Sequence, residues 1–205
     1  MNFINFFVFG LITFLITKIS IPYLKVYFAA IPTNRGMHKI IKPTAGGISF
    51  ILIYIFFSIF KSFYIPLISL PLALIGLLDD KFNISSKIRF IAQIITLIVT
   101  IICIKNSEVT FLTNFLENNF LFYFVFILLG ISIINFVNFM DGIDGLVCGS
   151  FILILSLINP LQNNLLPLIG ALIGFLRLNW ESSKIFMGDT GSLFLGSFIV
   201  SILYR

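Results

Sequence analysis

All five aspartates of this chain lie in three short clusters, and they are the residues best suited to chemistry. The clusters hold Asp79 with Asp80, Asp141 with Asp144, and Asp189 alone. Each cluster stands at one end of a long apolar run. An ionised carboxylate is costly there unless it faces a cavity, a metal ion or a substrate. The distribution therefore indicates one site assembled from three distant parts of the sequence.

The segment NFVNFMDGIDGL has the most specific pattern. Asn135, Asn138, Asp141 and Asp144 are spaced three residues apart, so consecutive members lie on adjacent helical turns. At 3.6 residues per turn, each step of three residues rotates the side-chain direction about the helix axis by about 60°. Only a helix end or a tighter turn therefore brings all four side chains together. The glycine after each aspartate permits such a turn and suits a loop that contacts phosphate. An Asn-rich helix cap with a glycine stop is the purely structural alternative.

The other two clusters are compatible with the same chemistry. The adjacent carboxylates Asp79 and Asp80 repel each other unless they share a proton or a cation, and Lys87 opens the next predicted helix. A solvated helix end paired with Lys81 is the alternative. Asp189, in IFMGDTGSLFLGS, can act as a helix N-cap or leave a helix N-terminus free for an anion. Carboxylate and amide oxygens without soft ligands favour Mg²⁺, or Mn²⁺, beside substrate phosphates.

Membrane helices must position these residues. Hydrophobic residues make up 59% and charged residues 10% of the 205 residues, whereas soluble domains have roughly 25% charged residues. Continuous apolar runs favour helices over a barrel, and Cys103 and Cys148 lie in such runs without metal-ligand spacing. We predict an all-α fold, a polytopic transmembrane helical bundle in a single domain, 1–205. Its eight predicted spans, with a re-entrant unit as an alternative for the last two, are 3–21, 45–61, 65–78, 89–105, 120–137, 146–159, 165–178 and 191–204.

The charges predict the orientation of this bundle. Ten of the 13 Lys and Arg residues fall on one side of the predicted spans. The positive-inside rule then places the N-terminus outside and all three aspartate clusters at the cytoplasmic face of the cell (inner) membrane. The longest connection on that face, residues 22–44, is a cationic segment that contains Arg35 and His38. This basic loop, together with the expected divalent metal and the glycine-containing turns, indicates a phosphorylated substrate. The apolar bundle next to it could hold a lipid.

The order and wording of the motifs resemble the polyprenyl-phosphate N-acetylhexosamine-1-phosphate transferases. This membrane family, glycosyltransferase family 4, includes phospho-N-acetylmuramoyl-pentapeptide transferase. The resemblance covers nearly the whole chain and rests on NRGMHKIIKPTAGG, GLLDD, NFVNFMDGIDGL and LRLNWESSKIFMGDTGS. The wording is most similar to the branch that initiates O-antigen.

The resemblance implies a Mg²⁺-dependent phosphoglycosyl transferase. Such an enzyme transfers a sugar 1-phosphate from a UDP-N-acetylhexosamine to undecaprenyl phosphate, releases UMP and initiates a lipid-linked cell-envelope glycan, such as the O-antigen of lipopolysaccharide. The implied partners are these two substrates and the lipid bilayer, with a homodimer as one assembly and without nucleic acid.

Residue roles follow from the same resemblance. Asn138 and Asp189 are expected to bind the metal. Asp79 and Asp80 would either remove a proton from the lipid phosphate or bind the metal. The full expectation is that the catalytic residues are Asp79, Asp80, Asp141 and Asp144, and that the substrate-binding residues are Arg35, His38, Lys87, Asn135 and Asp144.

One departure from the family pattern bears on activity. Family members usually continue through further helices and a cytoplasmic loop rich in histidine or arginine, so we expect this chain to be a C-terminally truncated member. A catalytically impaired protein that binds lipid phosphate or assists assembly is therefore an alternative function. A cation transporter is less favoured, because its ionisable residues would line the bilayer midplane rather than gather at one face.

Overall fold

The computed structural model describes residues 2–30, 41–105, 120–159 and 164–204. In these ranges the chain forms eight α-helices and one pair of two-residue strands. Strand β1 (Ala29–Ala30) pairs antiparallel with β2 (Lys42–Pro43). The helices are α1 (Asn2–Tyr27), α2 (Ile48–Phe60), α3 (Ile65–Phe82), α4 (Ser86–Lys105), α6 (Phe120–Met140), α7 (Leu146–Ile158), α8 (Leu166–Asn179) and α9 (Gly188–Leu203).

This architecture confirms the predicted all-α membrane fold. By length and composition, segments of α1, α4 and α6 can cross a membrane, and α2, α7, α8 and α9 are shorter apolar helices. Each predicted span corresponds to one helix, but several boundaries differ. In particular, helix α1 continues to Tyr27, α3 continues to Phe82, and α9 begins early at Gly188.

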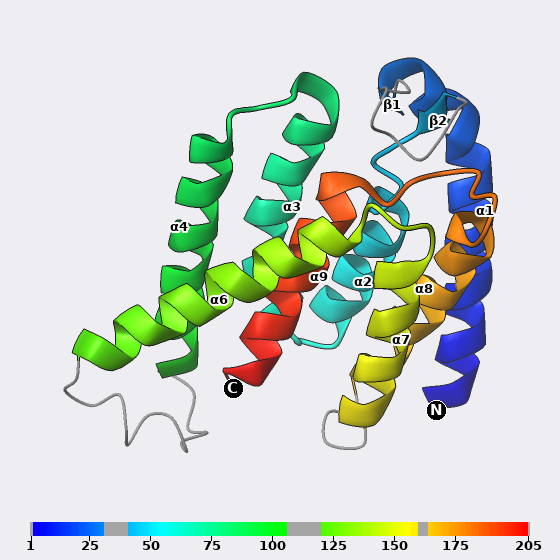
Figure 1. The fold of residues 1–205 in the computed structure, drawn as a ribbon. Coiled ribbons are helices and arrows are strands. Elements are labelled where there is room, and N and C mark those ends of the chain that lie inside the picture. The colour runs from blue at the N-terminus through cyan, green and yellow to red at the C-terminus, as the bar shows by residue number, and fades with distance from the viewer. Residues whose placement is uncertain (1, 31–40, 106–119, 160–163, 205) are drawn as a thin grey trace.

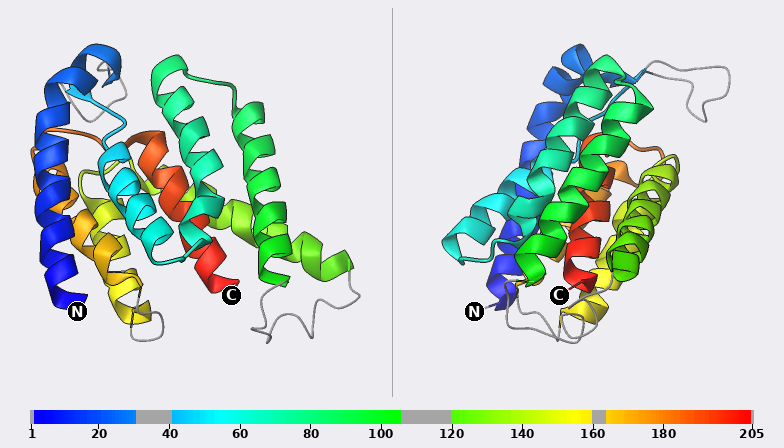
Figure 2. Two further views of the ribbon diagram at one scale, coloured as in Figure 1. Left: turned by 180° about the vertical axis from the view of Figure 1, so that it is seen from behind. Right: turned by 90° about the vertical axis from the view of Figure 1, so that its left-hand side faces the viewer.

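Helix α9 lies near the centre of the bundle, as the two views agree (Figures 1 and 2). It packs against α3 and α6, whereas α8 packs against α1 and α7. The last two helices share α2 as a neighbour and otherwise pack against different helices, and the alternative re-entrant unit stays a prediction. The described N- and C-terminal ends lie at one end of the molecule, and the two strands and the α3–α4 connection lie at the other (Figure 1).

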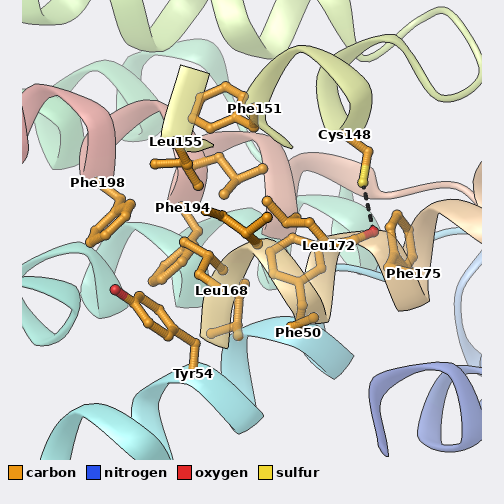
Figure 3. Close-up of a cluster of buried hydrophobic side chains, with 14 of the residues drawn as sticks. Phe50, Tyr54, Cys148, Phe151, Leu155, Leu168, Leu172, Phe175, Phe194 and Phe198 are labelled. Atoms are coloured by element: carbon orange, nitrogen blue, oxygen red, sulfur yellow. Dashed lines mark hydrogen bonds between the residues drawn. The ribbon is translucent and has the colours of Figure 1, made fainter. Parts of the chain in front are cut away.

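An aromatic core holds α9 against its neighbours. Phe194 and Phe198 of α9 are fully buried, and the ring of Phe198 meets that of Tyr54 from α2 edge-on at 5.5 Å. Figure 3 shows these rings beside leucines of α7 and α8. In the same core the Cys148 thiol donates a hydrogen bond to the Leu172 carbonyl at 3.2 Å. Cys148 thus packs as a small buried side chain, and both cysteines are unpaired.

Candidate active site at the start of helix α9

The segment that follows β2 packs against the residues that lead into α9. The N–H of Gly46 donates to the carbonyl of Phe186 at 3.0 Å, and the N–H of Gly47 donates to that of Met187 at 2.9 Å. Gly47 also lies so close to Gly191 that a methyl group on it would overlap the Gly191 Cα. The glycine pair is therefore needed for close backbone packing against α9.

Helix α3 contacts the first turn of α9 from another side. Gly76 has no room for a side chain because the backbone of Asp189 faces it. One turn later, the Asp80 carboxylate accepts hydrogen bonds from the N–H groups of Asp189 and Thr190, both at 3.0 Å. It also accepts from the hydroxyls of Thr190 at 2.6 Å and Thr44 at 3.1 Å. Asp80 thus joins three segments that are distant in sequence.

Asp189 itself is contacted by α4 and α6. One guanidinium nitrogen of Arg89 lies 2.8 Å from Asp189 Oδ2 and 2.9 Å from Asp79 Oδ2, so it bridges the two carboxylates. The Asn138 amide donates to Asp189 Oδ1 and to the Ser192 hydroxyl, both at 2.9 Å. The structure therefore brings the first and third aspartate clusters together with one asparagine of the second.

Three carboxylates, those of Asp79, Asp80 and Asp141, have a pKa above the usual value of an aspartate. Burial raises the pKa of Asp79 to about 7, reinforced by neighbouring Asp189 and opposed by the guanidinium of Arg89. Burial also raises the pKa of Asp80 to about 6, although its hydrogen bonds from α9 oppose the shift. The pKa of Asp141 lies well above its usual value because of burial and the negative charges of Asp80 and Asp189. Ionising all of these groups would require additional positive charge.

The donor set matches the chemistry of a hard divalent cation. Carboxylate and amide oxygens are the ligands that Mg²⁺ prefers, and Mg²⁺ commonly completes its shell with water and substrate phosphates. Among the described residues, however, no three His, Cys, Asp or Glu side chains form a preassembled metal site. Asp189 and Asn138 lie side by side in this set, and Arg89 already supplies positive charge beside Asp189.

Asp144 faces a different space from Asp189. It accepts a hydrogen bond from the N–H of Ser183 at 3.3 Å, and its Oδ2 lies 3.6 Å from the Lys42 ammonium. These residues line a cavity of about 830 Å³. Lys25 and Lys184 also line this cavity, so the described part of its wall has three lysines and two acids. It can therefore accept an anion larger than a single phosphate.

Asn135 and Lys87 line a second cavity, of about 380 Å³, between α4, α6 and α9. Asn135 does not contact the carboxylates, because its amide exchanges two hydrogen bonds with Gln93 of α4, at 3.0 and 3.1 Å. Arg89 and Asn138 line the same cavity. The second cavity therefore adjoins the carboxylate cluster and offers it an exposed ammonium group, that of Lys87.

Some site residues were not in the predicted set, and two predicted residues lie outside the described part of the chain. Arg35 and His38 fall in residues 31–40, which the structure does not describe. The additional residues that contact the cluster are Thr44, Arg89 and Thr190. Thr44 and Thr190 lie within sequence motifs, and Arg89 lies nine residues after Asp80. The sequence pattern did not indicate which polar residues would contact the aspartates of another motif.

Comparison with known proteins agrees with the motif resemblance. The family model of glycosyl transferase family 4 matches residues 62–205. The chain is 31% identical to a probable undecaprenyl-phosphate N-acetylglucosaminyl 1-phosphate transferase of Bacillus subtilis, over 96% of the chain and 61% of that relative. It is 30% identical to the undecaprenyl-phosphate alpha-N-acetylglucosaminyl 1-phosphate transferase of Thermotoga maritima, over 93% of the chain and 61% of that relative.

The chain is also similar to a second kind of relative. The chain is 32% identical to the phospho-N-acetylmuramoyl-pentapeptide-transferase of Dictyoglomus thermophilum, over 98% of the chain and 72% of that relative. Across these three relatives, the chain spans between 61% and 72% of their length. The family predicted from the motifs is confirmed: the chain belongs to glycosyl transferase family 4.

Proposed function

We propose that this protein transfers a sugar 1-phosphate from a UDP-N-acetylhexosamine to undecaprenyl phosphate. The main support is the cluster in which Arg89 bridges Asp79 and Asp189 and Asn138 donates to Asp189. The smaller cavity adjoins this cluster, and the larger, lysine-lined cavity lies at Asp144. A reaction between two anionic phosphates needs positive charge between them and separate places for donor and acceptor. The two cavities offer the separate places, and a metal ion held by the carboxylates would add to the positive charge of Arg89.

The donor would occupy the larger cavity. Lys25, Lys42 and Lys184 supply positive charge for a diphosphate, and Asp144 can accept hydrogen bonds from a nucleotide. The acceptor phosphate would occupy the smaller cavity beside Lys87. Its oxygen attacks the sugar-bearing phosphorus, the bond from that phosphorus to the UMP oxygen breaks, and UMP leaves with the electron pair. The product is a polyprenyl diphosphate sugar.

The protein's own residues would organise charge more than move protons. A phosphate monoester has a second pKa of about 6, so the acceptor is largely ionised at neutral pH. Mg²⁺, or Mn²⁺, held by Asp189 and Asn138 with Asp141 nearby would neutralise charge on the donor diphosphate and the departing UMP. Arg89 would relieve the mutual repulsion of Asp79 and Asp189 before substrate binds.

The proposal places the reaction at the cytoplasmic face of the cell (inner) membrane, with the N-terminus outside. The excess of Lys and Arg on one side of the spans supports this orientation. The product would initiate a cell-envelope glycan. Among the candidate polymers, the wording of the motifs favours the O-antigen of lipopolysaccharide. Among the candidate assemblies, a homodimer is compatible with the family resemblance.

UMP release tests the proposal. The full chain in lipid nanodiscs with undecaprenyl phosphate, UDP-N-acetylglucosamine and Mg²⁺ should release UMP and form a lipid-linked sugar phosphate. Asp189→Ala should reduce the rate at least about 100-fold, because a methyl group cannot replace a carboxylate that is proposed to hold the metal ion. Lys61→Gln, beyond the far end of α2, is the matched surface control. Binding of undecaprenyl phosphate without any UMP release would refute transfer and favour the lipid-phosphate-binding alternative.

A further inference from the structure

We propose that Asp80 is a positioning residue: it caps the first turn of α9 from across the α3–α9 interface and thereby orients Asp189. This inference rests on the proposed function of the same site and gives the two adjacent aspartates different roles. Asp79 faces the Arg89 guanidinium, whereas Asp80 faces the backbone of α9. Asp80 then acts through Asp189 rather than on substrate or metal.

The start of α9 lacks a cap of its own. A helix leaves its first N–H groups without intrahelical partners, and a Ser, Thr, Asp or Asn side chain at the N-cap usually accepts from them. The N-cap residue of α9 is Met187, which makes no side-chain cap hydrogen bond. The two oxygens of Asp80 accept from the N–H groups of Asp189 and Thr190 instead. A carboxylate at this end of a helix is also favoured by the helix dipole.

The acceptor capacity of Asp80 is largely used within the protein. An ionised carboxylate has about four acceptor positions. Besides the two N–H groups, the hydroxyls of Thr190 and Thr44 donate to Asp80. Four protein donors therefore surround the group that was expected to bind metal or remove a proton.

The backbone around Asp80 is shaped to admit its carboxylate. Gly188 has a φ of 76° and would place a Cβ 2.6 Å from both Asp80 Oδ1 and the Thr44 hydroxyl oxygen. Gly76, one turn before Asp80 on α3, lets the Asp189 backbone approach. These contacts fix the distance between α3 and α9, so they make the cap possible and also make it specific to this pair of helices.

The functional consequence concerns where the Asp189 carboxylate points. Asp189 lies in the capped turn, and its two oxygens meet Arg89 and Asn138. If the turn frays, the side chain loses its fixed direction toward both partners. Loss of the cap should therefore lower kcat with little change in the KM for the UDP-sugar, because the donor cavity lies beside Asp144 instead.

Amide hydrogen exchange tests the capping role without requiring activity. Asp80→Asn, in the full chain in nanodiscs, should speed exchange in the peptide that covers residues 188–192 by roughly 5- to 30-fold, the range expected for loss of a helix cap. The matched control is Asp79→Asn, which removes the neighbouring carboxylate and should leave exchange in that peptide as in the parent. Unchanged exchange in Asp80→Asn would overturn the proposal.

A milder variant keeps the test informative if Asp80→Asn does not fold. Thr190→Val removes one donor to Asp80 and should speed exchange in the same peptide, but it should add little in the Asp80→Asn background because the shared contact is already lost. Fully additive effects would overturn the proposal.

If the parent releases no UMP, the proposed transfer fails while the exchange result still decides the capping role. If the parent is active, Asp80→Asn should reduce kcat about 10- to 100-fold with KM nearly unchanged, and loss of activity with parent-like exchange would assign Asp80 to substrate or metal instead.

Discussion

Replacement of Arg89 by Gln should destabilise the protein more than the same replacement of any other lysine or arginine in the described part of the chain. The Arg89 side chain is 30% exposed, and it bridges Asp79 and Asp189, whose side chains are 10% and 26% exposed. The substitution leaves two carboxylates next to each other without their shared cation. Asp79 suffers most, because it is the least exposed of the three groups.

The magnitude follows from the partial burial. Two unit charges 4 Å apart interact by about 4 kcal/mol at an effective dielectric constant of about 20. Partial exposure of the groups and the remaining amide of Gln reduce this interaction energy. For comparison, a hydrogen bond to a charged group contributes about 1.5–3 kcal/mol. A net loss of about 2–4 kcal/mol is expected. For a chain of this size that lowers the melting temperature by about 5 to 15 °C.

Thermal unfolding in detergent measures this loss. Lys87→Gln is the matched control, since it also removes one positive charge, two residues before Arg89, but from an exposed side chain. This control should shift the melting temperature by less than about 2 °C. Arg89→Lys should fall in between, because an ammonium keeps the positive charge, but the shorter lysine side chain has to reach the point where one Arg89 nitrogen now contacts both carboxylates. Equal melting temperatures for Arg89→Gln and Lys87→Gln would refute the bridging role.

Three further experiments test other parts of the site. Gln93→Leu should cost about 0.5–1.5 kcal/mol because it removes the hydrogen bonds between Gln93 and the exposed Asn135 amide, and Asn135→Leu added to it should recover part of the loss in the same melting assay. Gly47→Ala should strongly lower thermal stability because its methyl group meets backbone, whereas Gly142→Ala, whose methyl group would lie 3.8 Å from its nearest neighbour atom, should be tolerated. Asp141→Asn should raise the melting temperature at pH 8 more than at pH 5. The folded-state pKa of Asp141 lies above its unfolded value, so stability is lost as the pH rises through that folded pKa, and a neutral amide removes this loss.

Hydropathy was sufficient to locate the helices because each span is a continuous apolar run. It was not sufficient to locate their ends. The left-handed conformation of Asn83, with φ of 49°, closes α3 four residues after the predicted boundary at residue 78. Helix α9 begins early because Asp80, more than 100 residues away, supplies its cap. A contact of that range leaves no signal in the local sequence pattern.

The spacing of the second motif predicted a helix end, and α6 does end at Met140. The pattern could not show that the turn after α6 places Asp141 and Asp144 in different surroundings. Asp141 lies in the electrostatic environment of Asp80 and Asp189, whereas Asp144 pairs with Lys42 in the larger cavity. Side-chain spacing sets the angle between residues along a helix, but beyond its end the direction depends on which loop packs there.

The glycines of the motifs also divide into two kinds. The sequence suggested phosphate contact for the glycines that follow Asp141 and Asp144. Gly47, Gly76 and Gly188, by contrast, face protein backbone or the Asp80 carboxylate at distances that leave no room for a side chain. Gly142 differs, because a Cβ there would meet nothing closer than 3.8 Å and the residue lines the lysine-rich cavity. Close packing therefore accounts for the first three, and of these four glycines Gly142 is the one beside which a substrate phosphate has room. The same residue type thus positions α9 in three places and leaves the donor cavity accessible in a fourth.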